Sequence, residues 1–166
     1  ILLRANPLAV KIPFNNQFPV HLHLRKNSVA NLDVVKELER AHPEGVRYNG
    51  SSGTALASYL CDSSIDPKID PRIVRFLLDL YPEAARDRIG AGLPIHWQCL
   101  NECADEEVIE ALIKAYPDSV KVIADTSASD DEMHMEGDLP LHCYLYCMHA
   151  KPSLVQMLID ADPEST

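Results

Sequence analysis

The feature of this 166-residue chain that most constrains its fold is a four-residue motif that returns along the sequence. The motif consists of an apolar residue, a proline, an aliphatic residue and a histidine. It stands at Phe18-Pro19-Val20-His21, Leu93-Pro94-Ile95-His96 and Leu139-Pro140-Leu141-His142, with a degenerate copy at Thr54-Ala55-Leu56-Ala57. Recurrence of this kind predicts an array of one supersecondary element, and we call each copy a repeat.

A second marker, centred on a proline, lies between successive motifs. Its prolines are Pro7, Pro43, Pro82, Pro117 and Pro163. From the motif to the next marker the distances are 24, 27, 23 and 23 residues, and from the marker to the next motif they are 12, 12, 12 and 23. The longer fourth connection contains the acidic segment 125–136, which has no apolar periodicity and is expected to be a surface insertion.

The stretch between motif and marker has the pattern of two short helices joined by a turn. A proline is favourable in the first turn of a helix, because its missing N–H would have no partner there. In the third repeat, Asp105 predicts a cap for the second helix, and Pro117 is expected to end that helix. One face of the first helix is expected to carry His96, Cys99, Leu100 and Cys103. The apolar stripe of the second helix is Val108, Ile109, Leu112 and Ile113.

These patterns predict a single all-α domain, a solenoid of about four helix-turn-helix repeats. The repeats span roughly residues 14–49, 50–88, 89–124 and 137–166, with the insertion 125–136 before the last. Ile1-Leu2-Leu3 is expected to be the tail of a helix from a fifth repeat, and the chain is interpreted as a fragment of a longer protein. Each helix pair has one apolar stripe that it cannot bury alone, so neighbouring pairs must stack.

Charge limits the classes of partner. The formal net charge is −10 and the pI is about 5.0, which disfavours nucleic acid and anionic membrane surfaces and favours a basic protein partner. No apolar run approaches the ~18 residues needed to span a bilayer. The five cysteines show no disulfide framework, which indicates reduced thiols and an intracellular, cytoplasmic location.

The motif histidines could suggest catalysis, but one histidine per repeat favours a structural role. We expect His21, His96 and His142 to bond to backbone groups and join neighbouring repeats, while Pro19, Pro94 and Pro140 start the helices. The cysteines at 99, 103, 143 and 147 could suggest zinc, which needs four ligands converging within ~2.0–2.3 Å. Cysteine also packs as a small apolar residue, and we expect neither a metal nor any other cofactor.

The motif, together with paired aliphatic residues in the second helix, resembles the ankyrin repeat family. The usual lead of that family is Thr-Pro-Leu-His, of which Thr54 keeps the threonine. The distances of 36, 39 and 46 residues between motif positions exceed the ankyrin period of about 33. The Tyr81-Pro82-Glu83-Ala84-Ala85 marker is not standard for the family, so the resemblance is to a divergent, lengthened class of ankyrin-like repeats.

The resemblance implies stacked helix pairs that recognise other proteins on a concave face formed by inner helices and turns. Carried over by position, the partner-binding residues would be Arg25, Lys26, Asp62, Leu100, Asn101 and Tyr146. The turn residues expected on the same side are Gln17, Gly53, Gly92 and Asp138. The leading hypothesis is a non-catalytic protein-binding module or scaffold. Alternatives are the targeting arm of an enzyme whose catalytic domain lies outside this sequence, and a structural spacer.

Overall fold

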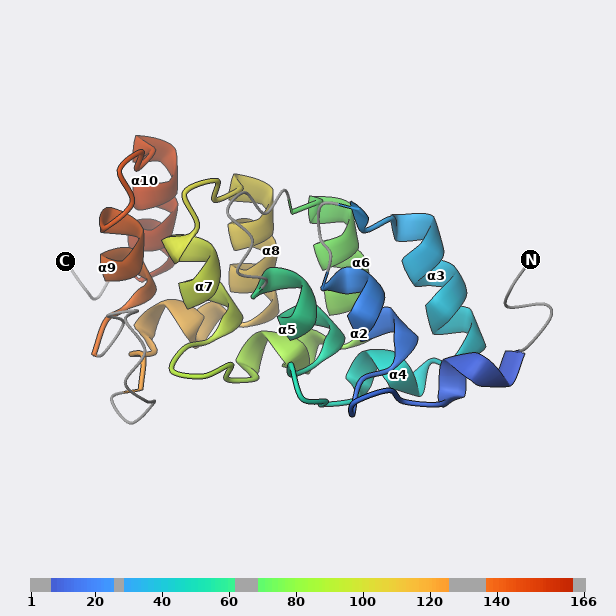
Figure 1. Cartoon of the computed structure of the whole chain (residues 1–166). Helices are drawn as coiled ribbons and strands as arrows, with labels where there is room; N and C mark the ends of the chain where they lie inside the picture. The colour runs from blue at the N-terminus through green and yellow to red at the C-terminus, as the bar shows by residue number, and fades with distance from the viewer. Residues whose placement is uncertain (1–6, 26–28, 62–68, 126–136, 163–166) are drawn as a thin grey trace. The chain divides into compact units, whose positions relative to one another are not determined.

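The computed structural model describes residues 7–25, 29–61, 69–125 and 137–162, and over these ranges the fold is all-α (Figure 1). No β-strand forms within them, and only isolated bridges occur, in the turns. The tail of a fifth repeat at residues 1–3 and all but the first residue of the insertion 125–136 lie outside the described residues. The chain divides into two compact units, residues 1–84 and 85–166.

Unit 1 consists of two helix pairs and two short helical segments. Its elements are η1 (Pro7–Lys11, a 3-10 helix), α2 (Pro19–Leu24), α3 (Leu32–Ala41), α4 (Glu44–Arg47), α5 (Ala55–Leu60) and α6 (Pro71–Leu80). Helix α2 packs against α3, α5 packs against α6, and the two pairs meet through α2 with α5 and α3 with α6. The unit therefore has an inner row, α2 and α5, and an outer row, α3 and α6.

Unit 2 has the same construction. After η3 (Pro82–Arg86), which spans the division between the units, it contains α7 (Pro94–Leu100), α8 (Glu106–Ala115), η4 (Pro117–Lys121), α9 (Pro140–Leu145) and α10 (Pro152–Ala161). The inner helices α7 and α9 pack together, as do the outer helices α8 and α10.

The helix starts follow the local chemistry. Pro19, Pro94 and Pro140 are the first residues of α2, α7 and α9, as predicted. Three outer helices are capped by side-chain oxygens that accept N–H bonds from the first turn, and the cap predicted at Asp105 is among them. The donor to acceptor distances are 2.9 Å from Asp33 N to Asn31, 2.9 Å from Arg72 N to Asp70 and 2.8 Å from Glu107 N to Asp105.

The marker prolines end the outer helices, and most of them are also followed by a short helical segment. Each outer helix ends two residues before its marker, at Ala41, Leu80, Ala115 and Ala161, so the expected termination is confirmed. At the first four markers, however, a further short helical segment follows: η1, α4, η3 and η4. The two-helix description was therefore incomplete, because a proline that cannot continue one helix is well suited to begin the next.

The turns before the motifs share one geometry. Isolated bridges pair Phe14 with Gln17, Gly50 with Gly53 and Ile89 with Gly92. Positive φ values occur at Asn15, Asn16, Gly53, Gly90 and Gly137, a conformation that glycine and asparagine tolerate. Before the fourth motif, Ala124 N donates to Asp138 O at 2.9 Å, in the register of the other bridges. The long connection therefore leaves and re-enters the fold at one such turn.

Two expectations on helix faces and turns are wrong. Helix α7 ends at Leu100, so Cys103 is in a turn and does not share a helix face with His96. The reason is that Asn101 adopts an extended conformation and its side chain accepts the Cys103 N–H at 2.9 Å. Gln17 and Gly92 are buried and cannot line a binding face, because the bridge turns them inward and the Gln17 amide bonds to Ser52 Oγ.

The core of each unit lies between its inner and outer rows. The residues that fill it are at most 1% exposed: Leu24, Val35, Leu56 and Ile73 in unit 1, and Ile95, Ile109, Leu112 and Leu154 in unit 2. Burial of each such side chain contributes roughly 1.5–3 kcal/mol.

Candidate protein-binding surface

His96 uses both ring nitrogens inside the fold. The Leu93 N–H donates to Nδ1 at 3.1 Å, and Nε2 lies 2.9 Å from the Val122 carbonyl oxygen. A backbone N–H can only donate, so Nδ1 accepts and the proton is on Nε2, which donates to Val122. Burial lowers the pKa of His96 below its ordinary value, which keeps the ring neutral.

The other two motif histidines, His21 and His142, differ in the sequence separation of their hydrogen bonds. The Nε2 of His21 lies 3.0 Å from the Tyr48 carbonyl, and burial lowers the pKa of this ring as well. His142 has a side chain that is 52% exposed, and its Nδ1 accepts the Leu139 N–H at 3.3 Å, within the motif itself. His96 thus contacts a backbone carbonyl 26 residues away, and His21 contacts one 27 residues away.

A second side-chain contact, which the sequence reasoning missed, joins inner to outer helices. This contact uses the residue two positions after the motif histidine. It is His23 after His21 and Tyr144 after His142. In the degenerate copy it is Tyr59, two positions after Ala57. His23 Nε2 accepts the Asn31 N–H at 3.1 Å, Tyr59 Oη accepts that of Asp70 at 2.7 Å, and Tyr144 Oη accepts that of Lys151 at 2.8 Å. In each case the donor is the residue that precedes the outer helix. The sequence signal that could have revealed this contact is a histidine or tyrosine at the same register position in three repeats.

The predicted partner-binding residues divide between the units. Arg25 is exposed directly after α2 in unit 1, while Lys26 and Asp62 lie outside the described residues. In unit 2, Leu100 ends α7 and is partly exposed, and Tyr146 follows α9 and is 66% exposed. Asn101 is partly exposed, but its side chain also holds the turn after α7.

The turns after α7 and α9 lie next to each other. The Cys147 thiol donates to the Cys99 carbonyl at 3.1 Å and lies 3.8 Å from the Asn101 carbonyl. Figure 1 shows α7 and α9 side by side. The two turns follow the C-terminal ends of these helices and are therefore neighbours as well. We name the resulting area the tip surface and define it by Leu100, Asn101, Glu102, Tyr146 and Met148. Met148 is 85% exposed, so the tip surface offers apolar side chains to solvent.

The tip surface belongs to the acidic half of the chain. Residues 1–84 contain ten Lys or Arg and nine Asp or Glu, a formal charge of +1, whereas residues 85–166 contain five and sixteen, a formal charge of −11. Glu102 acts on the surface directly: burial raises the pKa of the Cys147 thiol, and the Glu102 charge raises it further. The tip surface therefore lies in a unit with a strongly negative formal charge.

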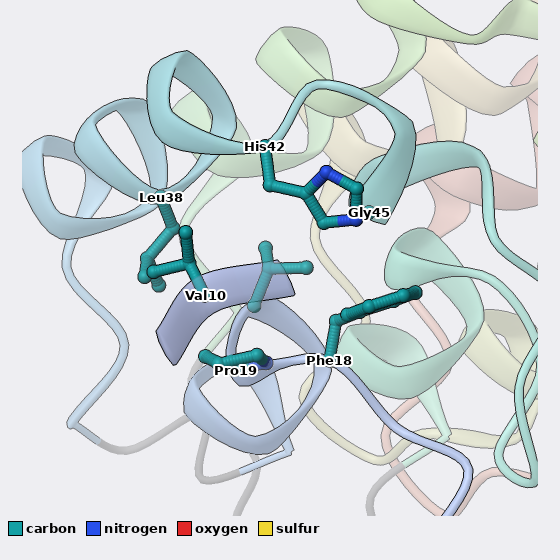
Figure 2. Close-up of a pocket in the computed structure, with 7 residues that line it drawn as sticks. Val10, Phe18, Pro19, Leu38, His42 and Gly45 are labelled. Atoms are coloured by element: carbon teal, nitrogen blue, oxygen red, sulfur yellow. The ribbon is translucent and has the colours of Figure 1, made fainter. Parts of the chain in front are cut away.

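A small pocket lies in unit 1, between η1, α2, α3 and α4 (Figure 2). Its lining residues surround about 160 Å³ of space that includes open solvent, and no part of it has room for a water molecule. Figure 2 shows the His42 ring facing Phe18 across it, with ring centroids 4.6 Å apart. His42 occupies the position of Tyr81 and Tyr116 at the next two markers, and the smaller ring fills less space. The pocket is a packing gap and not a ligand site.

Burial makes three of the five thiols, those of Cys61, Cys99 and Cys143, weak nucleophiles. All five cysteines are free, and burial raises the pKa of Cys143 and of Cys61 to about 12 and that of Cys99 well above its usual range. These thiols stay protonated, which disfavours nucleophilic reaction and metal binding. Among the described residues, no three His, Cys, Asp or Glu side chains are grouped to hold a metal ion. Nor does the described part of the chain contain a helix both long and apolar enough to cross a bilayer.

Comparisons of the chain with protein-family models, with curated proteins and with solved structures found no match. The resemblance to ankyrin repeats therefore depends on the sequence motifs alone.

Proposed function

We propose that the chain is a non-catalytic protein-binding module, an ankyrin-like repeat solenoid whose inner helices and turns bind a protein partner. The observation that carries this proposal is the tip surface, where Tyr146 is 66% and Met148 85% exposed at the joined ends of α7 and α9. Tyrosine and methionine are enriched at protein interfaces, and exposed apolar side chains that lie together mark interaction sites.

The charge of unit 2 favours a basic partner. A formal charge of −11 on residues 85–166 favours a segment with Lys or Arg residues around an apolar anchor. Complementary charge accelerates the encounter, and burial of an aromatic or aliphatic anchor against Tyr146 and Met148 would supply most of the affinity.

Two further observations support a binding role over a catalytic one. Both nitrogens of His96 bond to backbone groups, so this ring is not available as a general base. The buried thiols of Cys99 and Cys143 have raised pKa values and are weak nucleophiles. Five free thiols also favour a reducing compartment, and we propose that the module acts in the cytoplasm.

The test is selection of peptide ligands from a random display library on the immobilised chain. We expect enriched peptides to combine basic residues with an apolar anchor, and their affinity to decrease with salt. Combined Tyr146→Ala and Met148→Ala replacement should weaken the selected peptides by about tenfold or more, because the anchor loses its contact area.

The matched control is Ile123→Ala, which removes an apolar side chain that is 56% exposed in the same unit but outside the tip surface. It should leave peptide affinity unchanged. The proposal is contradicted if the enriched peptides are acidic, or if they bind the double variant as tightly as the unmodified chain. Because Tyr146 and Met148 are exposed, neither substitution should impair folding, and circular dichroism would verify this.

A further inference from the structure

The tip surface contains two pairs of equivalent register positions. Leu100 and Tyr146 stand seven residues after the first residue of their motifs, and Glu102 and Met148 stand nine residues after it. Each of the four side chains is partly or largely exposed, so exposure here belongs to the register position and not to one helix pair. Glu102 therefore presents a carboxylate where the next repeat presents a thioether.

The Glu102 carboxylate is available to a ligand, whereas its neighbours are engaged within the fold. Asp105 accepts the Glu107 N–H at 2.8 Å as the cap of α8, and Glu106 accepts the Ser153 hydroxyl at 2.6 Å. Glu102 is exposed, and within the described ranges its carboxylate makes no hydrogen bond or ion pair. A partner that covers this carboxylate must supply a cation, because a charge buried without a partner is costly.

Glu102 also lies close to the apolar part of the tip surface. The Cys147 thiol is 3.8 Å from the carbonyl of Asn101, the residue before Glu102. Burial raises the pKa of this thiol, and the Glu102 charge raises it further. Helices α7 and α9 pack together, and packed helices lie about 8–10 Å apart, so we expect Glu102 and Met148 to be separated by about that distance.

We propose that Glu102 determines which partner the tip surface accepts, by pairing with one Lys or Arg near the apolar anchor of the partner. An extended segment rises about 3.3 Å per residue, so a cation about two or three residues from an anchor on Met148 reaches Glu102. Arginine forms the stronger pair, because its guanidinium donates to both carboxylate oxygens. This role of Glu102 rests on the proposed function, and it makes one local contact, and not the net charge of unit 2, the source of the preference for basic ligands.

The experiment uses peptides from the display library on the full 166-residue chain, unmodified and with Glu102→Gln or Glu102→Lys. On the unmodified chain we expect enriched peptides to carry Lys or Arg about two or three residues from the anchor, and on Glu102→Lys that preference should be lost. Glu102→Gln should weaken such a peptide by about tenfold, since a hydrogen bond to a charged group is lost. The same peptide with its Lys or Arg replaced by Ala should bind Glu102→Gln and the unmodified chain equally.

The matched control is Glu110→Gln, which makes the same change in net charge at an exposed position of α8, outside the tip surface. It should change affinity by less than about twofold at 0.15 M salt, where charges more than about 8 Å from the ligand are screened. Both substitutions replace exposed side chains, and the fluorescence of Trp97 would verify that each variant is folded.

Equal weakening by Glu102→Gln and Glu110→Gln would overturn the role of Glu102 and assign the preference to the charge of the whole unit. Peptides with basic residues at no fixed distance from the anchor would overturn it too. Either result leaves the proposed function intact, provided that combined Tyr146→Ala and Met148→Ala replacement weakens the peptides. If that double variant binds as tightly as the unmodified chain, the proposed function fails and the role of Glu102 fails with it.

Discussion

The stability of unit 2 should depend strongly on one motif histidine and weakly on the other. His96 and His142 occupy the same position of the same motif, but His96 is fully buried and the His142 side chain is 52% exposed. In His96→Ala the N–H of Leu93, a residue only 2% exposed, loses its acceptor, and the Val122 carbonyl loses its donor. Each buried group left without a partner costs about 1–3 kcal/mol, and the cavity adds to this.

We therefore expect His96→Ala to lower the free energy of unfolding by about 3–5 kcal/mol, a large part of the roughly 5–15 kcal/mol of a typical domain. His142→Ala should cost less than about 1 kcal/mol, since water can replace its bond to Leu139. His96→Asn should recover part of the loss, because the amide oxygen can still accept the Leu93 N–H. The assay is urea unfolding followed by the fluorescence of Trp97, the one tryptophan of the chain, which lies beside His96 in α7. Equal losses for His96→Ala and His142→Ala would refute the reasoning.

Three other predictions concern pH, the inner-to-outer contact and a helix cap. Burial lowers the pKa values of His21 and His96 in the folded chain, so the unfolded chain takes up protons first as the pH falls through about 6.5. Stability should therefore decrease from pH 7.5 toward pH 5, with a slope of up to about 1.4 kcal/mol per pH unit for each histidine, and His96→Gln should reduce that slope in urea titrations. Tyr144→Phe should cost about 1–2 kcal/mol in chemical unfolding, because the Lys151 N–H loses its acceptor, whereas Tyr146→Phe at an exposed position should be neutral; equal effects would contradict the assignment. Asp105→Ala should lower stability by about 1 kcal/mol through loss of the cap on α8, and Asp105→Asn, which keeps an acceptor, should restore most of it in the same assay.

Local chemistry explains why much of the fold was predictable from sequence. Helix boundaries depend on residues within one turn of them: a proline at the first position, as in Pro94, or a capping carboxylate, as in Asp105. The glycine and asparagine turns are equally local, because they are set by which residues tolerate positive φ. The third helical segment at the marker was missed because Pro43, Pro82 and Pro117 were interpreted only as ends of helices.

The candidate surface was predictable only in part. Leu100 and Tyr146 were assigned by position in the motif, but their proximity depends on the Cys147 contact with the Cys99 carbonyl, which joins residues 48 positions apart. The importance of Glu102 and Met148 arises from the same contact, and no sequence period indicated either residue. The acidic character of unit 2 was visible only once the division between residues 84 and 85 was known.

The all-α class, the motif register and the starts of the outer helices follow from the amino-acid sequence, because each depends on neighbouring residues. Tertiary structure alone decided what the repeated motif does in each copy. His21, His96 and His142 have the same local sequence signal, and yet only the first two are buried and bonded to a distant carbonyl. Burial depends on which helices pack over a side chain, and this is a property of residues far apart in the chain that a four-residue motif does not contain.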